Sequence, residues 1–517
     1  MRPSLTAPVY EGEPPPARFN IARHCLAEQS RHAPDKPALM IVREVADQGA
    51  DEVWSYAELE DAVRRLAAGF EDAGLSPGDR VLVRLGNSAN AALAFLAACA
   101  LGAVPIPVSS LLTAPEVEYL AADSDARLIV LSPELPIGEA GNGRIVMPEA
   151  EIADAIARHA ARAYSDTAAD DSGFLIYTSG TTSHPKGVLH AQRALWGRRP
   201  MYQGWYDMRS DDIVLHAGAL NWTYTLGTGL MDPLVNGATA VIFAGERSPD
   251  VWPELIERVG ATLFAAVPTV YRQILKYCDI STGRMPSLRH GLTAGEALRP
   301  DIAAEWQAAT GRRLYEAFGM SEISTYASSS PAIPPRPGSP GRPQAGRAVA
   351  LLPVEGDESP VAVGEEGVIA IHRTDPGLML GYWNGSSEAH FRGDWFVTGD
   401  LAVMDDEGYL WPRGRADDLM NVLGYRVSPV EVEEAVAEHP SVAEAAAVAV
   451  EVRPGVSIIK AFVVPEDNQP VDTETVLGRA RERLADYKMP REIAVVSALP
   501  RTANGKVRRD ILRNPDG

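Results

Sequence analysis

Apolar residues recur at helical spacing over residues 54–75, and a Ser-Pro-Gly-Asp turn separates this segment from the apolar run at 81–85. This order predicts a helix, a turn and a buried strand. The same order then repeats, with helices at 89–100 and 114–123 and strands at 104–108 and 128–131. Short buried strands that alternate with amphipathic helices indicate parallel α/β layers.

A second set of apolar segments follows the same alternation. It predicts strands at 213–216, 238–243 and 263–266 and helices at 252–259 and 302–310. Residues 328–347 are rich in Pro and Gly, and the strand-like segments after them, 367–372 and 409–411, predict a smaller β unit. We therefore expect two α/β subdomains and a β unit in this part of the chain.

The pattern changes after residue 416, which predicts a domain boundary. The segments that follow read as a strand and helix within 427–438, strands at 445–450 and 458–464, a helix at 473–484 and a strand at 492–496. About 100 residues suffice for a separate domain. The predicted fold is therefore α/β, with a large N-terminal domain, 1–416, followed by a small α+β domain, 417–517.

Composition narrows the class of protein. Apolar residues make up 46% of the chain and charged residues 23%, the balance of a globular protein. The net charge of −21 would repel a nucleic acid backbone over most of the surface. The three cysteines lack the spacing of a metal site or redox pair, and neither a signal peptide nor an apolar run of membrane length is recognisable. We expect a cytoplasmic protein without a membrane span.

The segment Tyr177-Thr-Ser-Gly-Thr-Thr-Ser-His-Pro-Lys-Gly187 is the strongest chemical signal, and it follows a short apolar strand at 174–176. Its glycine at 180 permits close backbone approach, Thr178, Ser179, Thr181 and Thr182 supply hydroxyl donors, and Lys186 adds positive charge. Lys186 is one of six lysines among 48 basic residues, which favours a task that needs a compact ammonium. We predict a polyphosphate site. It is not a Walker A loop, because Lys186 precedes its glycine and no Ser or Thr follows it.

Five further motifs follow this loop in a fixed order. They are Phe318-Gly-Met-Ser-Glu322, Phe396-Val-Thr-Gly-Asp400, Gly414-Arg-Ala-Asp-Asp418, Gly424-Tyr-Arg426 and Pro500-Arg-Thr-Ala-Asn-Gly-Lys506. Together with the loop they resemble the adenylate-forming superfamily of acyl-CoA synthetases, peptide synthetase adenylation domains and luciferases. Ser183 stands where that family usually has glycine.

The resemblance implies a role for each matching residue. Thr178, Ser179, Gly180, Thr181, Thr182 and Lys186 would bind the β- and γ-phosphates of ATP, Ser321 the α-phosphate, Glu322 a Mg²⁺ ion, and Asp400 with Arg415 the ribose. Gly295, Glu296, Ala297, Glu316, Ala317 and Phe318 would flank the adenine. Lys506 would bridge the reacting carboxylate and α-phosphate, with Lys186 and Glu322 as the other catalytic residues. Asp417 would be the hinge of a mobile C-terminal domain, whose rotation brings Gly424, Tyr425 and Arg426 to the CoA channel.

The segment 216–232 occupies the position where that family builds its acyl pocket. His216, Asn221 and Trp222, together with Ala294, Gly319 and Met320, are the expected pocket residues. Before Asp232 the segment has no Lys or Arg to pair a second substrate carboxylate, which favours a monocarboxylic acid, medium-chain aliphatic or aromatic. The Trp222 environment resembles the acetyl, medium-chain and benzoate ligase branches. The implied reaction is ligation of the acid to CoA through an acyl-adenylate, with ATP, Mg²⁺ and CoA, and a homodimer stays open.

Each interpretation has an alternative. Glu322 could be an ordinary carboxylate at a helix start, Asp400 could cap a turn, and Trp222 could be a core aromatic. Arg415, Asp417, Arg426 and Lys506 could be solvated charges. At the level of function, the alternatives are an adenylation enzyme that loads a carrier-protein thiol, a luciferase-like oxidase, and an inert nucleotide-binding relative.

Overall fold

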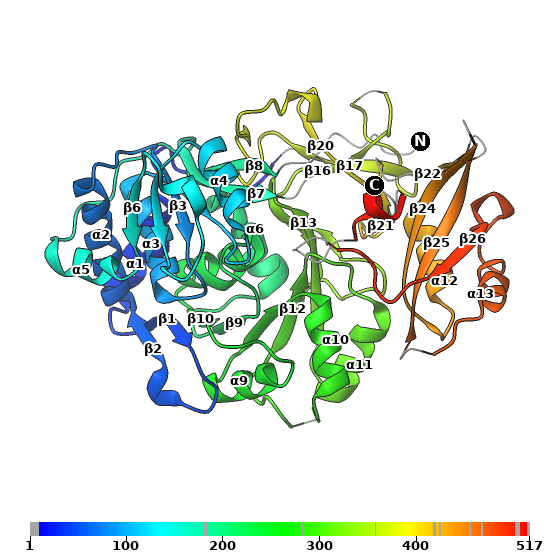
Figure 1. Cartoon of the computed structure of the whole chain (residues 1–517), viewed down its shortest axis with the longest axis horizontal. Helices are drawn as coiled ribbons and strands as arrows, with labels where there is room; N and C mark the ends of the chain where they lie inside the picture. Colours follow the sequence, from blue (N-terminus) through cyan, green and yellow to red (C-terminus); the bar gives the residue numbers. More distant parts are fainter. Residues whose placement is uncertain are drawn as a thin grey trace. The chain divides into compact units, whose positions relative to one another are not determined.

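The computed structural model describes residues 10–178, 185–281, 283–356, 358–416, 420–422, 425–453, 456–466, 469–501 and 507–513 (Figure 1). The chain forms two compact units. One contains Pro8–Val349 and Ile371–Phe396, and the other contains Ala350–Ala370 and Val397–Gly517. We call them the large unit and the small unit. No helix among the described residues has both the length and the apolar character needed to cross a bilayer.

The first predicted α/β layer is a four-stranded parallel sheet in the order β4-β3-β5-β6. Its strands are β3 (Arg80–Arg84), β4 (Val104–Pro107), β5 (Ala126–Leu131) and β6 (Ile145–Pro148). The helices of this layer are α2 (Tyr56–Asp72), α3 (Ala89–Leu101), α4 (Ala114–Asp123) and α5 (Glu151–Arg158). Helix α2 starts at a capping box, in which Ser55 and Glu58 satisfy each other's backbone N–H groups. The predicted alternation is confirmed here within a few residues.

Helix α3 is enclosed on all sides. Every one of its residues except Asn90 is buried, which matches a sequence that is apolar all round. It contacts α1 (Ile21–His32), α2, β3 and β4, and also β1 (Pro37–Val42) of the second sheet. Gly102 ends it in the left-handed conformation, with a φ of 78°.

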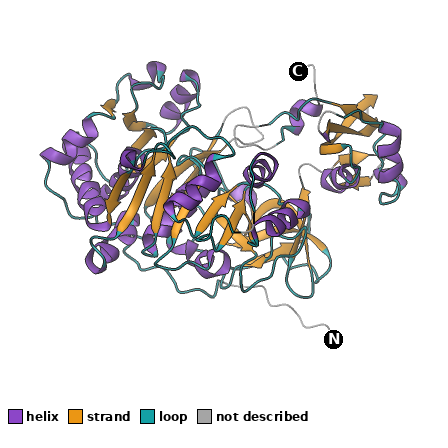
Figure 2. Cartoon of the chain, turned by 90° about the horizontal axis from the view of Figure 1, so that it is seen from below, coloured by secondary structure: helices purple, strands orange, loops and turns teal. Residues whose placement is uncertain are grey.

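The second layer is a nine-stranded sheet in the order β15-β14-β13-β12-β11-β9-β10-β1-β2. The strands from β13 to β1 run parallel, and the outer pairs are antiparallel. The strands not yet located are β2 (Glu52–Ser55), β9 (Ile213–His216), β10 (Thr239–Phe243), β11 (Leu263–Ala266), β12 (His290–Ala294), β13 (Leu314–Met320), β14 (Ser324–Ser328) and β15 (Arg342–Pro343). Helices α9 (Val251–Val259), α10 (Pro268–Tyr277) and α11 (Pro300–Thr310) belong to this layer (Figure 1). Figure 2, coloured by secondary structure, shows helices beside the strands of the sheets.

Between β8 (Lys186–Ala191) and β10 the chain forms short helical pieces. They are α6 (Arg199–Met201), α7 (Thr223–Leu226) and α8 (Asp232–Val235), with π-helical turns at Tyr202–Tyr206 and Gly227–Met231. A third sheet, in the order β18-β8-β7, also belongs to the large unit. In it β7 (Ser172–Thr178) and β8 (Lys186–Ala191) form a hairpin, and β18 (Gly381–Tyr382) pairs antiparallel to β8.

A five-stranded sheet has the order β16-β17-β20-β19, with β21 beside β20. Its strands are β16 (Val349–Leu352), β17 (Glu366–His372), β19 (Phe391–Arg392), β20 (Trp395–Met404) and β21 (Leu410–Arg415). The predicted β unit is therefore present, and it contains both strand-like segments recognised in the sequence.

From residue 420 onward the chain has the predicted α+β pattern. Its elements are β22 (Met420–Val422), β23 (Tyr425–Val427), α12 (Pro429–Ala437), β24 (Val442–Arg453), β25 (Val456–Pro465), α13 (Thr473–Ala480), β26 (Glu492–Val495) and α14 (Arg509–Arg513). Val432, Val436, Ile459, Val463 and Val476 form much of its core. The boundary at 416 and the hinge at Asp417 stay predictions, because residues 417–419 lie outside the described part.

Candidate active site

The predicted phosphate loop joins the two strands of the β7–β8 hairpin. Its stem pairs Thr178 with Lys186 and Tyr177 with Gly187. The Tyr177 hydroxyl donates to Asp123 Oδ2 at 2.6 Å, and the backbone N–H of Trp383 donates to the carbonyl of Gly187 at 2.8 Å. The described ends of the loop are therefore fixed from two directions. Its residues Ser179, Gly180, Thr181, Thr182 and Ser183 lie outside the described part of the chain.

Tyr382 connects two of the predicted catalytic residues. Its hydroxyl donates to Glu322 Oε1 at 2.8 Å, and the Lys186 ammonium lies 5.7 Å from the centre of its ring. The structure thus brings Lys186 and Glu322 to the same tyrosine, although they lie on β8 and in the turn after β13. Tyr382 was missed in the sequence. The signal available there was an aromatic pair, Tyr382-Trp383, in a polar segment.

Ser321 lies next to Glu322 in the turn after β13. Its carbonyl accepts a hydrogen bond from His190 Nε2 at 2.8 Å. Burial lowers the pKa of His190 to about 4, so the imidazole is neutral at physiological pH. Its ring stacks on Phe174 with the centroids 4.5 Å apart. His190, which was also missed, supports the backbone of Ser321 from the core.

The proposed adenine and acyl residues gather at one edge of the nine-stranded sheet. His216, Ala294 and Met320 are the last residues of β9, β12 and β13. Since Ala294 pairs with Ala317 in parallel strands, the segment 295–297 starts beside Phe318. The carboxyl ends of parallel strands are the usual place for a ligand site in such sheets. Gly319 is exposed at the same edge, and the adenine and acyl roles of these residues stay predictions.

Two carboxylates lie at this edge. Glu296 Oε2 accepts a hydrogen bond from the Thr269 hydroxyl at 2.7 Å. Glu316 Oε1 accepts from the backbone N–H of Leu298 at 3.0 Å, and desolvation raises the pKa of Glu316 to about 7. Glu316 therefore changes its charge close to neutral pH.

Trp222 stands against the backbone of Gly295. A Cβ atom at Gly295 would lie 3.0 Å from Cζ2 and Cη2 of the indole, and Gly295 has a φ of 91°. The Trp222 and Tyr224 rings meet edge to face at 5.6 Å. Tyr224 is buried and Trp222 is partly exposed. Tyr224 is thus a core aromatic, and Trp222 is a half-buried aromatic against the backbone of Gly295, whose pocket role stays a prediction.

His216 is buried beneath Tyr224, with the ring centroids 4.4 Å apart. Burial lowers its pKa to about 3, with a smaller contribution from Arg247. Its Nδ1 accepts from the backbone N–H of Gly218 at 2.9 Å, so the neutral ring carries its proton on Nε2. His216 therefore stabilises the turn before Trp222 and is too deeply buried to act as a base.

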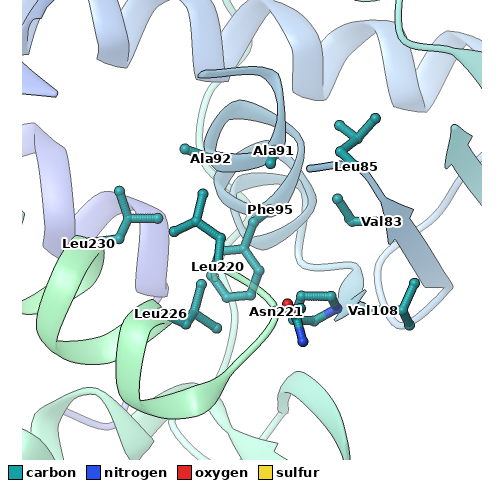
Figure 3. A pocket seen from close by; sticks show the side chains of 11 residues that line it. Val83, Leu85, Ala91, Ala92, Phe95, Val108, Leu220, Asn221, Leu226 and Leu230 are labelled. Carbon is teal, nitrogen blue, oxygen red and sulfur yellow. The ribbon is translucent and has the colours of Figure 1, made fainter. Parts of the chain in front are cut away.

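A small apolar cavity of about 10 Å³ lies next to Asn221 (Figure 3). Helix α3, the ends of β3 and β4 and the segment 220–230 enclose it. Its wall consists of Val83, Leu85, Ala91, Ala92, Phe95, Pro107, Val108, Leu220, Asn221, Leu226 and Leu230. Asn221 is the one polar side chain in this wall.

A second cavity, of about 20 Å³, extends inward from Ser321 and is lined by Thr223, His190 and Arg198 among others. The guanidinium of Arg198 is buried and binds both carboxylate oxygens of Asp232, at 2.8 and 2.6 Å. The Tyr206 hydroxyl donates to the same carboxylate at 2.8 Å. This ion pair was missed in the sequence, and it fully engages the Arg198 charge.

In the small unit, Asp400 and Arg415 lie opposite each other on β20 and β21. Arg415 Nη1 donates to Asp400 Oδ1 at 3.3 Å, and Gly399 turns the chain before Asp400 with a φ of 82°. The predicted pair is therefore in contact. Asp417, Gly424 and Lys506 lie outside the described residues, and so do the side chains of Tyr425 and Arg426.

Comparison with known proteins matches both parts of the chain to family models. Residues 26–383 match the "AMP-binding enzyme" model, and residues 431–506 match the "AMP-binding enzyme C-terminal domain" model. The chain is 34% identical to the benzoate–CoA ligase of Thauera aromatica over 89% of this chain and 90% of that enzyme. It is 31% identical to the acetyl-coenzyme A synthetase of Bacillus subtilis over 93% and 88%. ATP-bound MatB from Rhodopseudomonas palustris superposes with a TM-score of 0.87 at 27% identity, covering 96% of this chain and 99% of MatB.

Proposed function

We propose that the substrate is a monocarboxylic acid of the medium-chain aliphatic or aromatic class. The premise is that the chain belongs to the AMP-binding enzymes and is an acyl-CoA ligase of that family. One observation carries the proposal. Of the described residues around the two cavities, Arg198 alone is a permanent cation, and Asp232 neutralises it. A second substrate carboxylate that entered either cavity would therefore be desolvated without a cationic partner.

The first half-reaction joins two anions, the carboxylate and the α-phosphate of ATP. Catalysis then depends on charge neutralisation and in-line positioning. Lys186, at the end of the loop stem, is exposed and free to meet a phosphate with its ammonium. Asp400, with Arg415 beside it, would bind the ribose hydroxyls.

Glu322 fits a role in holding Mg²⁺. Mg²⁺ is commonly bound in nucleotide sites by one or two carboxylates together with substrate phosphates and water. Among the described residues no group of three or more His, Cys, Asp or Glu side chains could hold a metal, and Glu322 is a partly exposed carboxylate beside Ser321. When bound, Mg²⁺ would offset the charge of the phosphates.

The second half-reaction, transfer of the acyl group to CoA, needs the thiol to reach the adenylate. We infer that Asp417 is the hinge and that Lys506 leaves the site before the thiol enters. Gly424, Tyr425 and Arg426 would then contact pantetheine. The homodimer and the cytoplasmic location also stay predictions.

The test is an acid panel in which AMP and pyrophosphate release are measured with and without CoA. Straight-chain acids of two to ten carbons, benzoates and dicarboxylates should be compared. We expect kcat/KM to be highest for a medium-chain or aromatic monocarboxylate and to fall sharply for a matched dicarboxylate. Preference for a dicarboxylate would overturn the substrate assignment. Turnover that never requires CoA would favour transfer to a carrier protein.

A further inference from the structure

We propose that Tyr382 is a positioning residue of the phosphate site, which holds the Glu322 carboxylate and the Lys186 ammonium close together without letting them neutralise each other. The inference rests on the roles proposed above for Glu322 and Lys186. It assigns a task to a residue outside the motifs recognised in the sequence.

The backbone of Tyr382 is fixed to the stem of the loop. Strand β18 pairs with β8 in the register Gly381 to Leu189 and Tyr382 to Val188. The backbone N–H groups on either side, of Leu380 and Trp383, donate to the carbonyls of Leu189 and Gly187, each at 2.8 Å. The tyrosine therefore moves with the strand that carries Lys186.

Glu322 is held by the same segment at two points. Its carbonyl accepts from the backbone N–H of Met379 at 2.8 Å, and its Oε1 accepts from the Tyr382 hydroxyl at 2.8 Å. A hydrogen bond to an ionised carboxylate is stronger than one between neutral groups, so it fixes one orientation of the side chain. Oε2 and the second lone pair of Oε1 stay available to a cation.

The ring of Tyr382 acts on Lys186. The ammonium lies 5.7 Å from the ring centre, within the range of a cation–π contact. The ring also meets that of His390 edge to face, with the centroids 5.3 Å apart. A cation–π contact orients the ammonium and leaves its charge in place.

This arrangement solves a problem of charge. A direct ion pair between Lys186 and Glu322 would neutralise both charges, whereas here each of the two side chains contacts Tyr382. With both groups contacting the tyrosine instead of each other, the ammonium is available to phosphate oxygens and the carboxylate to Mg²⁺. Tyr382 thus contacts both charged side chains of the site, so that they do not neutralise each other.

Tyr382→Phe tests the hydroxyl, since it keeps the ring and removes the hydrogen bond. Tyr164→Phe is the matched control, because the Tyr164 hydroxyl donates to Glu60 at 3.0 Å and Arg64 lies 5.6 Å from its ring centre, outside the site. Binding of ATP should be measured by calorimetry without the acid, with and without Mg²⁺. The Mg²⁺ concentration for half-maximal adenylate formation should be measured in parallel.

For Tyr382→Phe we expect ATP binding to weaken about tenfold in the presence of Mg²⁺, and to change little in its absence. The Mg²⁺ requirement should rise by a similar factor. Tyr164→Phe should change neither quantity. Equal weakening of ATP binding with and without Mg²⁺, or identical behaviour of the two variants, would overturn the assignment.

Glu322→Gln separates this inference from the proposed function. If Glu322→Gln leaves the Mg²⁺ requirement unchanged, the metal role of Glu322 is wrong and the inference falls with it. If Glu322→Gln raises the requirement and Tyr382→Phe does not, only the role of Tyr382 is wrong. If both raise it and the double variant is no worse than Glu322→Gln alone, the hydroxyl acts through Glu322 as proposed.

Discussion

Replacing Gly295 by alanine should disturb the site through one defined contact. Gly295 has a φ of 91°, a conformation that costs an L-residue about 1–2 kcal/mol. The new Cβ would also lie 3.0 Å from two atoms of the Trp222 ring, which must move by a few tenths of an ångström. Overpacking of this kind typically costs about 1–3 kcal/mol.

Trp222 has little room to absorb this displacement. Its ring meets Tyr224 edge to face at 5.6 Å, and the Tyr224 hydroxyl is tied to the carbonyl of Leu292 at 3.2 Å. Since Trp222 is a proposed wall of the acyl pocket, part of the strain should appear in binding of the acid. A loss of about 1.4 kcal/mol corresponds to a tenfold rise in the KM for the acid.

Gly78→Ala supplies the matched control. Gly78 has a φ of 86°, but a Cβ there would have no heavy atom within 4 Å. Both variants should lower the melting temperature through the same backbone strain. Only Gly295→Ala should raise the KM for the acid. Adding Trp222→Phe to Gly295→Ala should recover part of the loss, because phenylalanine lacks the two crowded atoms.

The measurements are thermal unfolding of each variant and the KM for the acid in pyrophosphate release. The reasoning is refuted if Gly78→Ala and Gly295→Ala raise the KM equally. It is also refuted if Trp222→Phe brings no recovery, since the contact with the indole would then not be the cause.

Three further predictions follow from the described geometry and the proposed chemistry. Asp232→Asn should leave the buried Arg198 cation without its counter-charge and destabilise the protein by about 3–5 kcal/mol. The control Asp301→Asn, at an exposed ion pair, should cost less than about 1 kcal/mol. Thermal unfolding of both variants measures the difference in stability. The pKa of Glu316 is raised from 4.5 to about 7, so the folded protein binds this proton more tightly than the unfolded chain does, and the resulting stabilisation is lost as the pH rises through that window. Glu316→Gln should therefore flatten the fall of the melting temperature between about pH 5 and 7.5. An unchanged pH profile would exclude Glu316 as the cause. Lys506→Ala should abolish adenylate formation and leave thioester formation from supplied acyl-adenylate largely intact, and equal loss of both half-reactions would contradict the two-state scheme.

The sequence predicted those parts of the fold that depend on local patterns. The helices and strands from 54 to 131 and from 427 to 496 follow apolar periodicity closely, because each buries one face or is enclosed entirely. Strands β1 and β2 were missed, since β1 begins with proline and pairs with β10, some 200 residues away. Such pairing is set by tertiary contacts, which a local pattern does not contain.

Those residues of the candidate site that belong to a recognisable sequence motif could be predicted. Lys186 was recognised from the chemistry of the phosphate loop, and Ser321 and Glu322 from the resemblance of their motif to the adenylate-forming superfamily. Tyr382 and Arg198 were not, because their roles depend on a neighbour brought in by folding. Asp232 did carry a usable signal: a carboxylate within an apolar stretch needs a buried partner.

Helix α3 has a consequence for how the large unit unfolds. It contacts β3 and β4 of the four-stranded sheet and β1 of the nine-stranded sheet, and Phe95, Val83 and Ile41 belong to one continuous core. Neither sheet can open without exposing the same helix to water. The two α/β layers, which read as separate subdomains in the sequence, therefore share one cooperative transition, and the amides of α3 should be among the last to exchange with solvent.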